Sequence, residues 1–119
     1  MASDLKYQRV SRLTRSELIT QLESPDPQVV ANALYAATRY EQDWAWVQQQ
    51  CFKGLNSSEV PIRWAAATCL GDLAFFRRFP LDFGVVIDTL EVATKDPQIA
   101  DPAGFSLSLV RQVLKKETL

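Results

Sequence analysis

Residues 59–73 read EVPIRWAAATCLGDL, and their apolar and small side chains recur at every third or fourth position. Side chains with that spacing share one face of an α-helix, which completes a turn about every 3.6 residues. The small residues Ala65, Ala66, Ala67 and Gly71 allow neighbouring helices to approach closely. The larger apolar residues Ile62, Leu70 and Leu73 fill the space between the helices. The stretch therefore predicts a helix that packs tightly against other helices.

Start and stop signals divide the rest of the chain into further helices. Thr14 and Glu17 have the spacing of a capping box, in which each side chain satisfies an amide of the first helical turn. Asp26 is a suitable N-cap. Pro27 follows it at the first helical position, where the missing N–H of proline costs nothing because that amide has no partner inside the helix. The predicted helices span about residues 14–23, 27–40, 43–55, 60–78, 81–95 and 101–116. No segment has the alternating pattern of a strand.

The predicted helices repeat in pairs. The residues DPQV at 26–29 recur as DPQI at 96–99, and EVPI at 59–62 is the middle copy, at spacings of 33 and 37 residues. Such periods are typical of helical solenoids, in which each hairpin buries its apolar face on the next. We therefore expect an all-α fold, an α-solenoid of about three helical hairpins with five to six helices. It would form one domain over residues 1–119, with residues 1–13 as an irregular N-terminal arm, and Pro102 would make the last helix start late.

Composition limits the functional classes. The net charge of -1, from 13 basic and 14 acidic side chains, is too balanced for a sequence-independent nucleic-acid binder. No run of about 18 apolar residues exists, so we expect no membrane association. Cys51 and Cys69 both lie in apolar helical patterns, which favours free buried thiols and a cytoplasmic location. Because histidine, Gly-rich phosphate loops and metal-ligand spacings are all missing, we expect no catalytic residues, no cofactor and no metal site.

The stretch at 59–73 resembles the second helix of a HEAT repeat. It has an acid, a β-branched residue followed by Arg63, an alanine run, and then LGDL at 70–73. The longer run from Ala36 to Leu73, which includes DWAWVQ at 43–48, is similar to a group of short bacterial HEAT-type proteins. Several members of that group lie beside secreted polymorphic toxins and are thought to act as immunity proteins. The resemblance thus implies a protein that binds a toxin.

Trp46 is the first candidate for a partner-binding anchor. With Trp44 at the centre of the apolar face of its helix, Trp46 lies about 200° round the axis, on a side shared with Gln49, Gln50 and Lys53. An amphipathic ring among polar neighbours is a good binding anchor. The alternative is that Trp46 packs against the equivalent helix of the adjacent repeat.

Trp64 leads a second stripe, on the helix that spans about residues 60–78. In a solenoid the second helix of each pair lines the concave surface, so Trp64 would line a groove for the partner. Tyr35 would extend that surface, because it corresponds to Thr68 at the 33-residue offset. The alternative is burial on several sides of a central helix, and we expect such burial for Phe75 and, in the last helix, for Phe105.

Three carboxylates, those of Asp72, Asp88 and Glu91, are candidates for pairing with a basic partner. Asp72 occupies the same repeat position as Arg39, so an inter-repeat ion pair is its alternative role. Residues 80–101 hold five acidic residues against Lys95 alone, and such an acidic end would steer a basic partner such as the nucleic-acid-binding face of a nuclease toxin. The alternative is a solvated helix face with capping residues, a role that suits Asp82, Asp96 and Asp101.

These features predict a non-catalytic protein-binding module, an immunity protein that neutralises a cognate bacterial toxin. The predicted partner-binding residues are Trp46, Trp64, Tyr35, Asp72, Asp88 and Glu91. A HEAT-type adaptor or scaffold subunit of a larger assembly is the alternative. A third hypothesis is an enzyme, either a HEAT-type DNA glycosylase or a bilin-lyase-like subunit, but the chain lacks the basic groove expected of a glycosylase.

Overall fold

Six helices account for most of the residues that the computed structural model describes, which are 12–77 and 82–117. They are α2 (Arg15–Leu22), α3 (Pro27–Tyr40), α4 (Trp44–Leu55), α5 (Val60–Arg77), α6 (Phe83–Ala93) and α7 (Ala100–Glu117). The described ranges contain no strand, so the predicted all-α fold is confirmed. Most of the predicted N-terminal arm and the predicted boundary at 78–81 lie outside the described residues.

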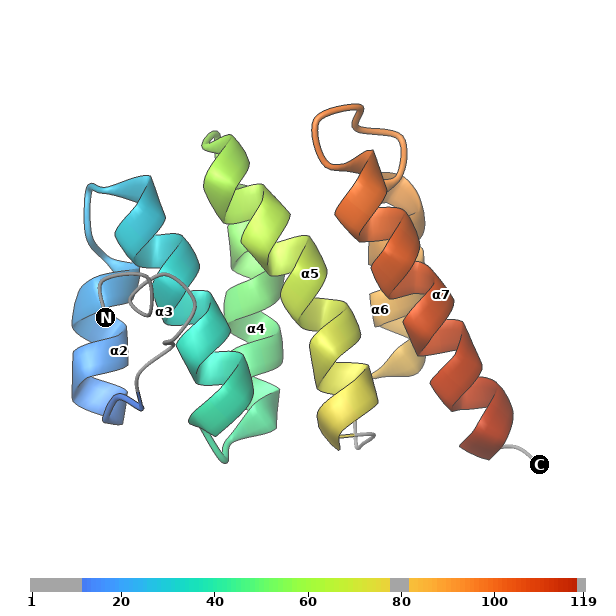
Figure 1. Cartoon of the computed structure of the whole chain (residues 1–119), viewed down its shortest axis with the longest axis horizontal. Coiled ribbons are helices and arrows are strands. Elements are labelled where there is room, and N and C mark those ends of the chain that lie inside the picture. The colour runs from blue at the N-terminus through green and yellow to red at the C-terminus, as the bar shows by residue number, and fades with distance from the viewer. Residues whose placement is uncertain (1–11, 78–81, 118–119) are drawn as a thin grey trace, which may run out of the picture.

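Consecutive helices form three hairpins, α2–α3, α4–α5 and α6–α7, which stack side by side along the molecule (Figure 1). The second helices of the hairpins, α3, α5 and α7, form one layer, in which α5 packs against both α3 and α7. Helices α4 and α6 lie behind this layer, and α2 packs against α3 at the end of the stack. The arrangement is the predicted stack of three helical hairpins.

Local chemistry sets where the helices begin. In the capping box before α2, the Glu17 amide donates to Thr14 Oγ1 at 3.1 Å, and the Thr14 amide donates to Glu17 Oε1 at 2.9 Å. Asp26, Asp43 and Asp82 each accept a hydrogen bond from an amide two or three residues later, at 3.0, 3.2 and 3.3 Å. These caps satisfy amides that have no partner inside the helix. The helix starts predicted at 14, 27 and 43 are therefore correct to within one residue.

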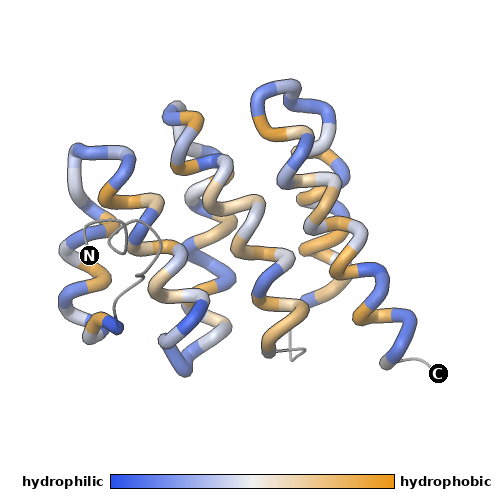
Figure 2. Tube along the Cα trace, in the orientation of Figure 1, coloured by the Kyte–Doolittle hydropathy of each residue, from blue (hydrophilic) through white to orange (hydrophobic). Residues whose placement is uncertain are grey.

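The core runs through all three hairpins. Large side chains that are almost completely buried come from every helix: Leu18, Leu34, Val47, Leu70, Leu73, Val86, Leu90 and Val110. Figure 2 shows hydrophobic residues recurring along each helix, whereas the turns between helices are mostly hydrophilic. The thiols of Cys51 and Cys69 are free and fully buried within this core. No described helix combines the length and hydropathy needed to cross a membrane.

Helices α5 and α7 approach each other closely at Gly71. The Ser106 hydroxyl on α7 donates a hydrogen bond to the Ala67 carbonyl on α5 at 2.7 Å. A Cβ atom added to Gly71 would lie 2.8 Å from the Ser106 Cα, which is closer than real Cβ atoms approach backbone. The close packing predicted from the small residues of 59–73 is thus found between α5 and α7.

Two aromatic side chains that were expected to be buried are exposed. Phe105 is 68% exposed and Phe75 is 54% exposed, so both predictions were wrong. On α7 the contact of Ser106 with α5 fixes the rotation of the helix, and Phe105 beside it points outward. On α5 the inward positions are taken by Leu73 and Ala74, both fully buried.

The predicted late start of the last helix is confirmed, because α7 begins at residue 100.

Arg63 joins the second hairpin to the third. Its Nε donates to Asp96 Oδ2 at 3.3 Å, and its two terminal nitrogens donate to the Ser57 carbonyl at 3.1 Å and to Gln98 Oε1 at 2.6 Å. The Arg63 side chain is only 13% exposed, and its bonds to Asp96 and to the Ser57 carbonyl are partly buried, whereas its bond to Gln98 is exposed. Arg63 therefore has the structural role of holding the turn before α7 against the turn before α5.

Replacing Arg63 with methionine should lower the free energy of unfolding by about 1–2 kcal/mol, because three hydrogen bonds to a charged group are lost while the apolar stem remains. Arg111→Met is the matched control, since Arg111 pairs with Glu91 on a surface where both side chains are about half exposed. Such a pair contributes about 0–1 kcal/mol. Urea denaturation of the two variants would measure the difference, and equal losses would contradict the role assigned to Arg63.

Candidate functional site

The predicted partner-binding residues lie on three separate surfaces. Tyr35 on α3 and the pair Trp64 and Asp72 on α5 lie on the layer of second helices. Trp46 on α4 lines a groove between α2 and α4. Asp88 and Glu91 are exposed on α6. The structure therefore does not bring the six residues into one site.

Trp46 is held within the fold by α2. The guanidinium of Arg15 lies over the Trp46 ring, 4.1 Å from its centroid. The same guanidinium pairs with Glu41 at 3.0 Å and with Asp43 at 3.1 Å. The hydrogen bond from this guanidinium, with its positive charge, lowers the pKa of the Glu41 carboxyl. The half-buried Trp46 thus packs against a neighbouring repeat, as its alternative interpretation expected.

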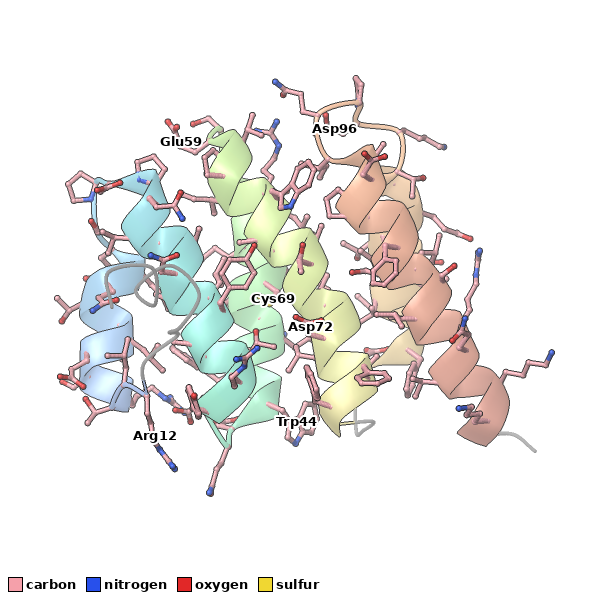
Figure 3. The ribbon with its side chains drawn as sticks, in the orientation of Figure 1. Arg12, Trp44, Glu59, Cys69, Asp72 and Asp96 are labelled. Carbon is pink, nitrogen blue, oxygen red and sulfur yellow. The ribbon has the colours of Figure 1, made fainter. Side chains whose placement is uncertain are left out.

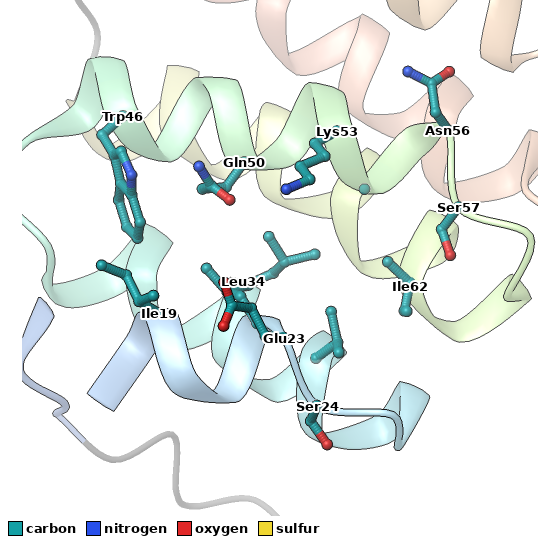
Figure 4. Close-up of a pocket in the computed structure, with 13 residues that line it drawn as sticks. Ile19, Glu23, Ser24, Leu34, Trp46, Gln50, Lys53, Asn56, Ser57 and Ile62 are labelled. Atoms are coloured by element: carbon teal, nitrogen blue, oxygen red, sulfur yellow. The ribbon is translucent and has the colours of Figure 1, made fainter. Parts of the chain in front are cut away.

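A groove of about 660 Å³ separates α2 from α4 (Figure 4). Leu34 and Ile62, from α3 and α5, contribute to its apolar lining, while Gln50 and Lys53 of α4 are among its polar residues. The groove forms where α2, with only 8 residues, leaves part of α4 uncovered. The sequence contained no signal for it, because its width depends on the spacing of two helices that are distant along the chain.

Aromatic side chains gather on the exposed side of the second helices, which we call the second-helix face. Its exposed members are Trp64, Phe75 and Phe76 on α5 and Phe105 on α7, and Trp64 is 42% exposed. Phe75 and Phe76 stack edge to face, with centroids 5.2 Å apart. Exposed aromatic rings of this kind are over-represented in protein interfaces. Trp64 is thus exposed rather than buried on several sides, and its role in partner binding stays a prediction.

A small cleft between α3 and α5, which we call the Asp72 cleft, brings two of the predicted residues together. It has a volume of about 70 Å³ and is lined by Tyr35, Thr38, Arg39, Asp72 and Phe76. Asp72 lies on α5 in the layer of second helices (Figure 3). Phe76 and Arg39 were not predicted as site residues. For Phe76 the sequence offered no clear signal, because it lies three residues after Leu73 and so shares the apolar side of the helix by periodicity.

Burial governs the titration of the cleft. It raises the pKa of the Asp72 carboxyl, an effect that the charge of Arg39 opposes. It also raises the pKa of the Tyr35 hydroxyl, which lies beside Thr68. Arg39 acts on Asp72 through space, and the direct ion pair expected between these two residues does not form. Among residues 12–77 and 82–117, the charge of the Asp72 carboxylate is thus only partly compensated.

Replacing Asp72 with asparagine should raise the free energy of unfolding near neutral pH. Because its pKa is raised by folding, the stability associated with protonated Asp72 is fully present below the ordinary value of 3.8 and is lost as the pH rises through the higher folded value. Asp72→Asn does not suffer this loss. Its gain in melting temperature over the native protein should therefore be larger at about pH 7 than at about pH 3. A gain that is independent of pH would contradict the burial of the carboxylate.

The acidic residues near the C-terminal end are largely engaged in structural roles. Asp82 caps α6, Asp96 accepts from the Gln98 amide at 2.9 Å, and Glu91 pairs with Arg111 on α7. Asp88 is exposed on α6. Among residues 12–77 and 82–117, no three His, Cys, Asp or Glu side chains come together as metal ligands would. The capping interpretation thus holds for Asp82, whereas Asp96 accepts its bond within the turn before α7 and Asp101 lies inside α7, so the capping role expected of these two was wrong. The binding roles of Asp88 and Glu91 stay predictions.

The fold has a counterpart among solved structures. A chain in the crystal structure of a CDI complex from Cupriavidus taiwanensis LMG 19424 matches this chain with a TM-score of 0.80 and 28% sequence identity. The match covers 90% of this chain and 96% of that chain. No protein-family model matches the sequence, and no curated protein is significantly similar to it. The likeness therefore extends over nearly the whole of both chains, while the resemblance to HEAT repeats stays a prediction.

Proposed function

We propose that this chain is an immunity protein, which binds a toxin domain and neutralises it without catalysing a reaction. In contact-dependent inhibition (CDI) a toxin is neutralised by its immunity protein. The observation that carries the proposal is the match to a chain of such a complex over 90% of this chain. We further propose that the three hairpins are HEAT-type repeats, that they form one domain, and that the protein acts in the cytoplasm on a protein partner rather than on nucleic acid or a membrane.

Two features of the chain support a binding role over a catalytic one. The whole sequence contains no histidine, the most common general base at neutral pH. The second-helix face instead presents exposed Trp64, Phe75, Phe76 and Phe105, which suit a protein interface. In the proposed mechanism this face covers the toxin and blocks access to its substrate, so that neutralisation is steric and electrostatic.

The test is co-expression of this chain with the toxin domain encoded beside its gene. If the proposal is right, cells that make the toxin alone stop growing, cells that make both proteins grow, and the two proteins co-purify. The toxin domain of an unrelated CDI system serves as the specificity control and should not be neutralised. Failure of the cognate pair to co-purify, or co-purification only with a protein that is not a toxin, would contradict the immunity function.

A further inference from the structure

The carboxylate of Asp72 is available to a partner. It forms no direct hydrogen bond or ion pair with another residue of the described ranges. Within the same ranges, the one fully buried side-chain polar atom that lacks a partner is Arg15 Nε, so the oxygens of Asp72 reach the surface. A half-buried carboxylate that is still accessible is an acceptor for a positively charged donor.

The walls of the Asp72 cleft suit the same kind of donor. Tyr35 on one side and Phe76 on the other contribute aromatic rings, and ring faces attract ammonium and guanidinium groups. The volume of about 70 Å³ admits the end of one side chain but no larger ligand. Charge, shape and the chemistry of the walls therefore point to the tip of a lysine or arginine side chain.

Among the residues that the structure describes, Arg39 is the cation that competes for Asp72. Its side chain is exposed and lines the cleft, but its charge reaches Asp72 only through space. An incoming guanidinium or ammonium group that contacts Asp72 directly would have the shorter and stronger interaction. Arg39 can then turn into solvent without leaving a buried charge.

We propose that the Asp72 cleft receives a lysine or arginine side chain of a protein partner, with the charge against Asp72 and the stem between Tyr35 and Phe76. This step rests on the proposed function, under which the partner is the toxin. Because an immunity protein must match its toxin, a single buried charge contact of this kind also supplies specificity.

The cleft can be tested on the free protein, without any toxin. The probes are propylguanidinium and butylammonium, which mimic the ends of arginine and lysine, titrated against the isotope-labelled protein and followed by amide chemical shifts. We expect saturable shifts around residues 35–39 and 72–76 with at least one of the two cations, and none with propionate, the anionic control. Asp72→Asn should abolish the shifts. Glu59→Gln, which removes an exposed carboxylate at the start of α5, should retain them.

The same variants test the contact in the complex. Binding of the co-purified toxin domain, measured by calorimetry, should weaken about tenfold or more in Asp72→Asn. Glu59→Gln should change the affinity less than about twofold, and Arg39→Gln should leave it unchanged or strengthen it, because the competing cation is gone. Equal losses in Asp72→Asn and Arg39→Gln would overturn the proposal, since they would mean that the two residues act only as a structural pair.

The two experiments separate the cleft from the proposed function. If no toxin binds but the cations shift the cleft residues, the immunity function is wrong and the cleft stands. If the toxin binds, and Asp72→Asn neither weakens it nor changes the cation titration, the immunity function stands and the cleft proposal is overturned. Shifts that persist in Asp72→Asn would equally overturn it.

Discussion

Gly71→Val is expected to lower the free energy of unfolding by about 3 kcal/mol, at the upper end of the range for overpacked cores. A Cβ at this position would lie 2.8 Å from the Ser106 Cα, and a backbone atom cannot turn aside as the end of a side chain can. Helices α5 and α7 would have to separate. That movement would also break the hydrogen bond from Ser106 to the Ala67 carbonyl. Chemical denaturation followed by circular dichroism measures the loss.

Gly104→Ala is the matched control for this prediction. Gly104 lies on α7, two residues from Ser106, and a Cβ added there meets nothing within 4 Å. Glycine is a poor helix former, so this variant should be more stable than the native protein by up to about 1 kcal/mol. If Gly71→Val and Gly104→Ala unfolded at the same denaturant concentration, the close approach of α5 and α7 would not be a determinant of stability.

Trp64→Ala is expected to weaken toxin binding by about 2 kcal/mol or more, which is roughly a thirtyfold loss of affinity. Trp64 is 42% exposed near the start of α5 on the aromatic second-helix face, where a large ring can be buried by a partner. Its removal should change the free energy of unfolding by less than about 1 kcal/mol, because it contributes little to the core. Calorimetry with the toxin domain and thermal denaturation of the free protein measure the two effects.

Trp46→Ala should show the opposite behaviour. Its ring packs between α4 and α2 under the Arg15 guanidinium, so truncation should cost stability, about 2–3 kcal/mol for a half-buried ring. Binding should change little once the protein is folded.

If Trp64→Ala bound the toxin as tightly as the native protein, the second-helix face would not be the interface.

The parts of the fold that could be predicted from the sequence are those set by local chemistry or by the repeat. The capping box of Thr14 and Glu17 and the aspartate caps act over three residues, so they can be recognised without the rest of the molecule. The repeat also makes Tyr35 equivalent to Thr68 and Arg39 equivalent to Asp72, so these four residues are expected on adjacent turns of neighbouring second helices. The meeting of three of them in one cleft follows from that stacking.

What could not be predicted depends on contacts between segments that are distant along the chain. The outward orientation of Phe105 results from the contact of Ser106 with Gly71, 35 positions earlier in the sequence. The groove between α2 and α4 depends on how far α2 extends along its neighbour. Helical periodicity identifies an apolar side of each helix but does not fix its rotation to within one residue.

The stacking order divides the molecule into a stiff middle and compliant ends. Helix α5 contacts α3, α4, α6 and α7, whereas α2 packs mainly against α3, and α6 packs mainly against α7. In a stack held together by neighbour contacts, an end unit can loosen at low cost while the central unit opens only when the whole chain unfolds. Trp64 and Asp72 both lie on α5, so their positions relative to each other stay fixed when a partner binds. The outer helices can adjust to the shape of that partner.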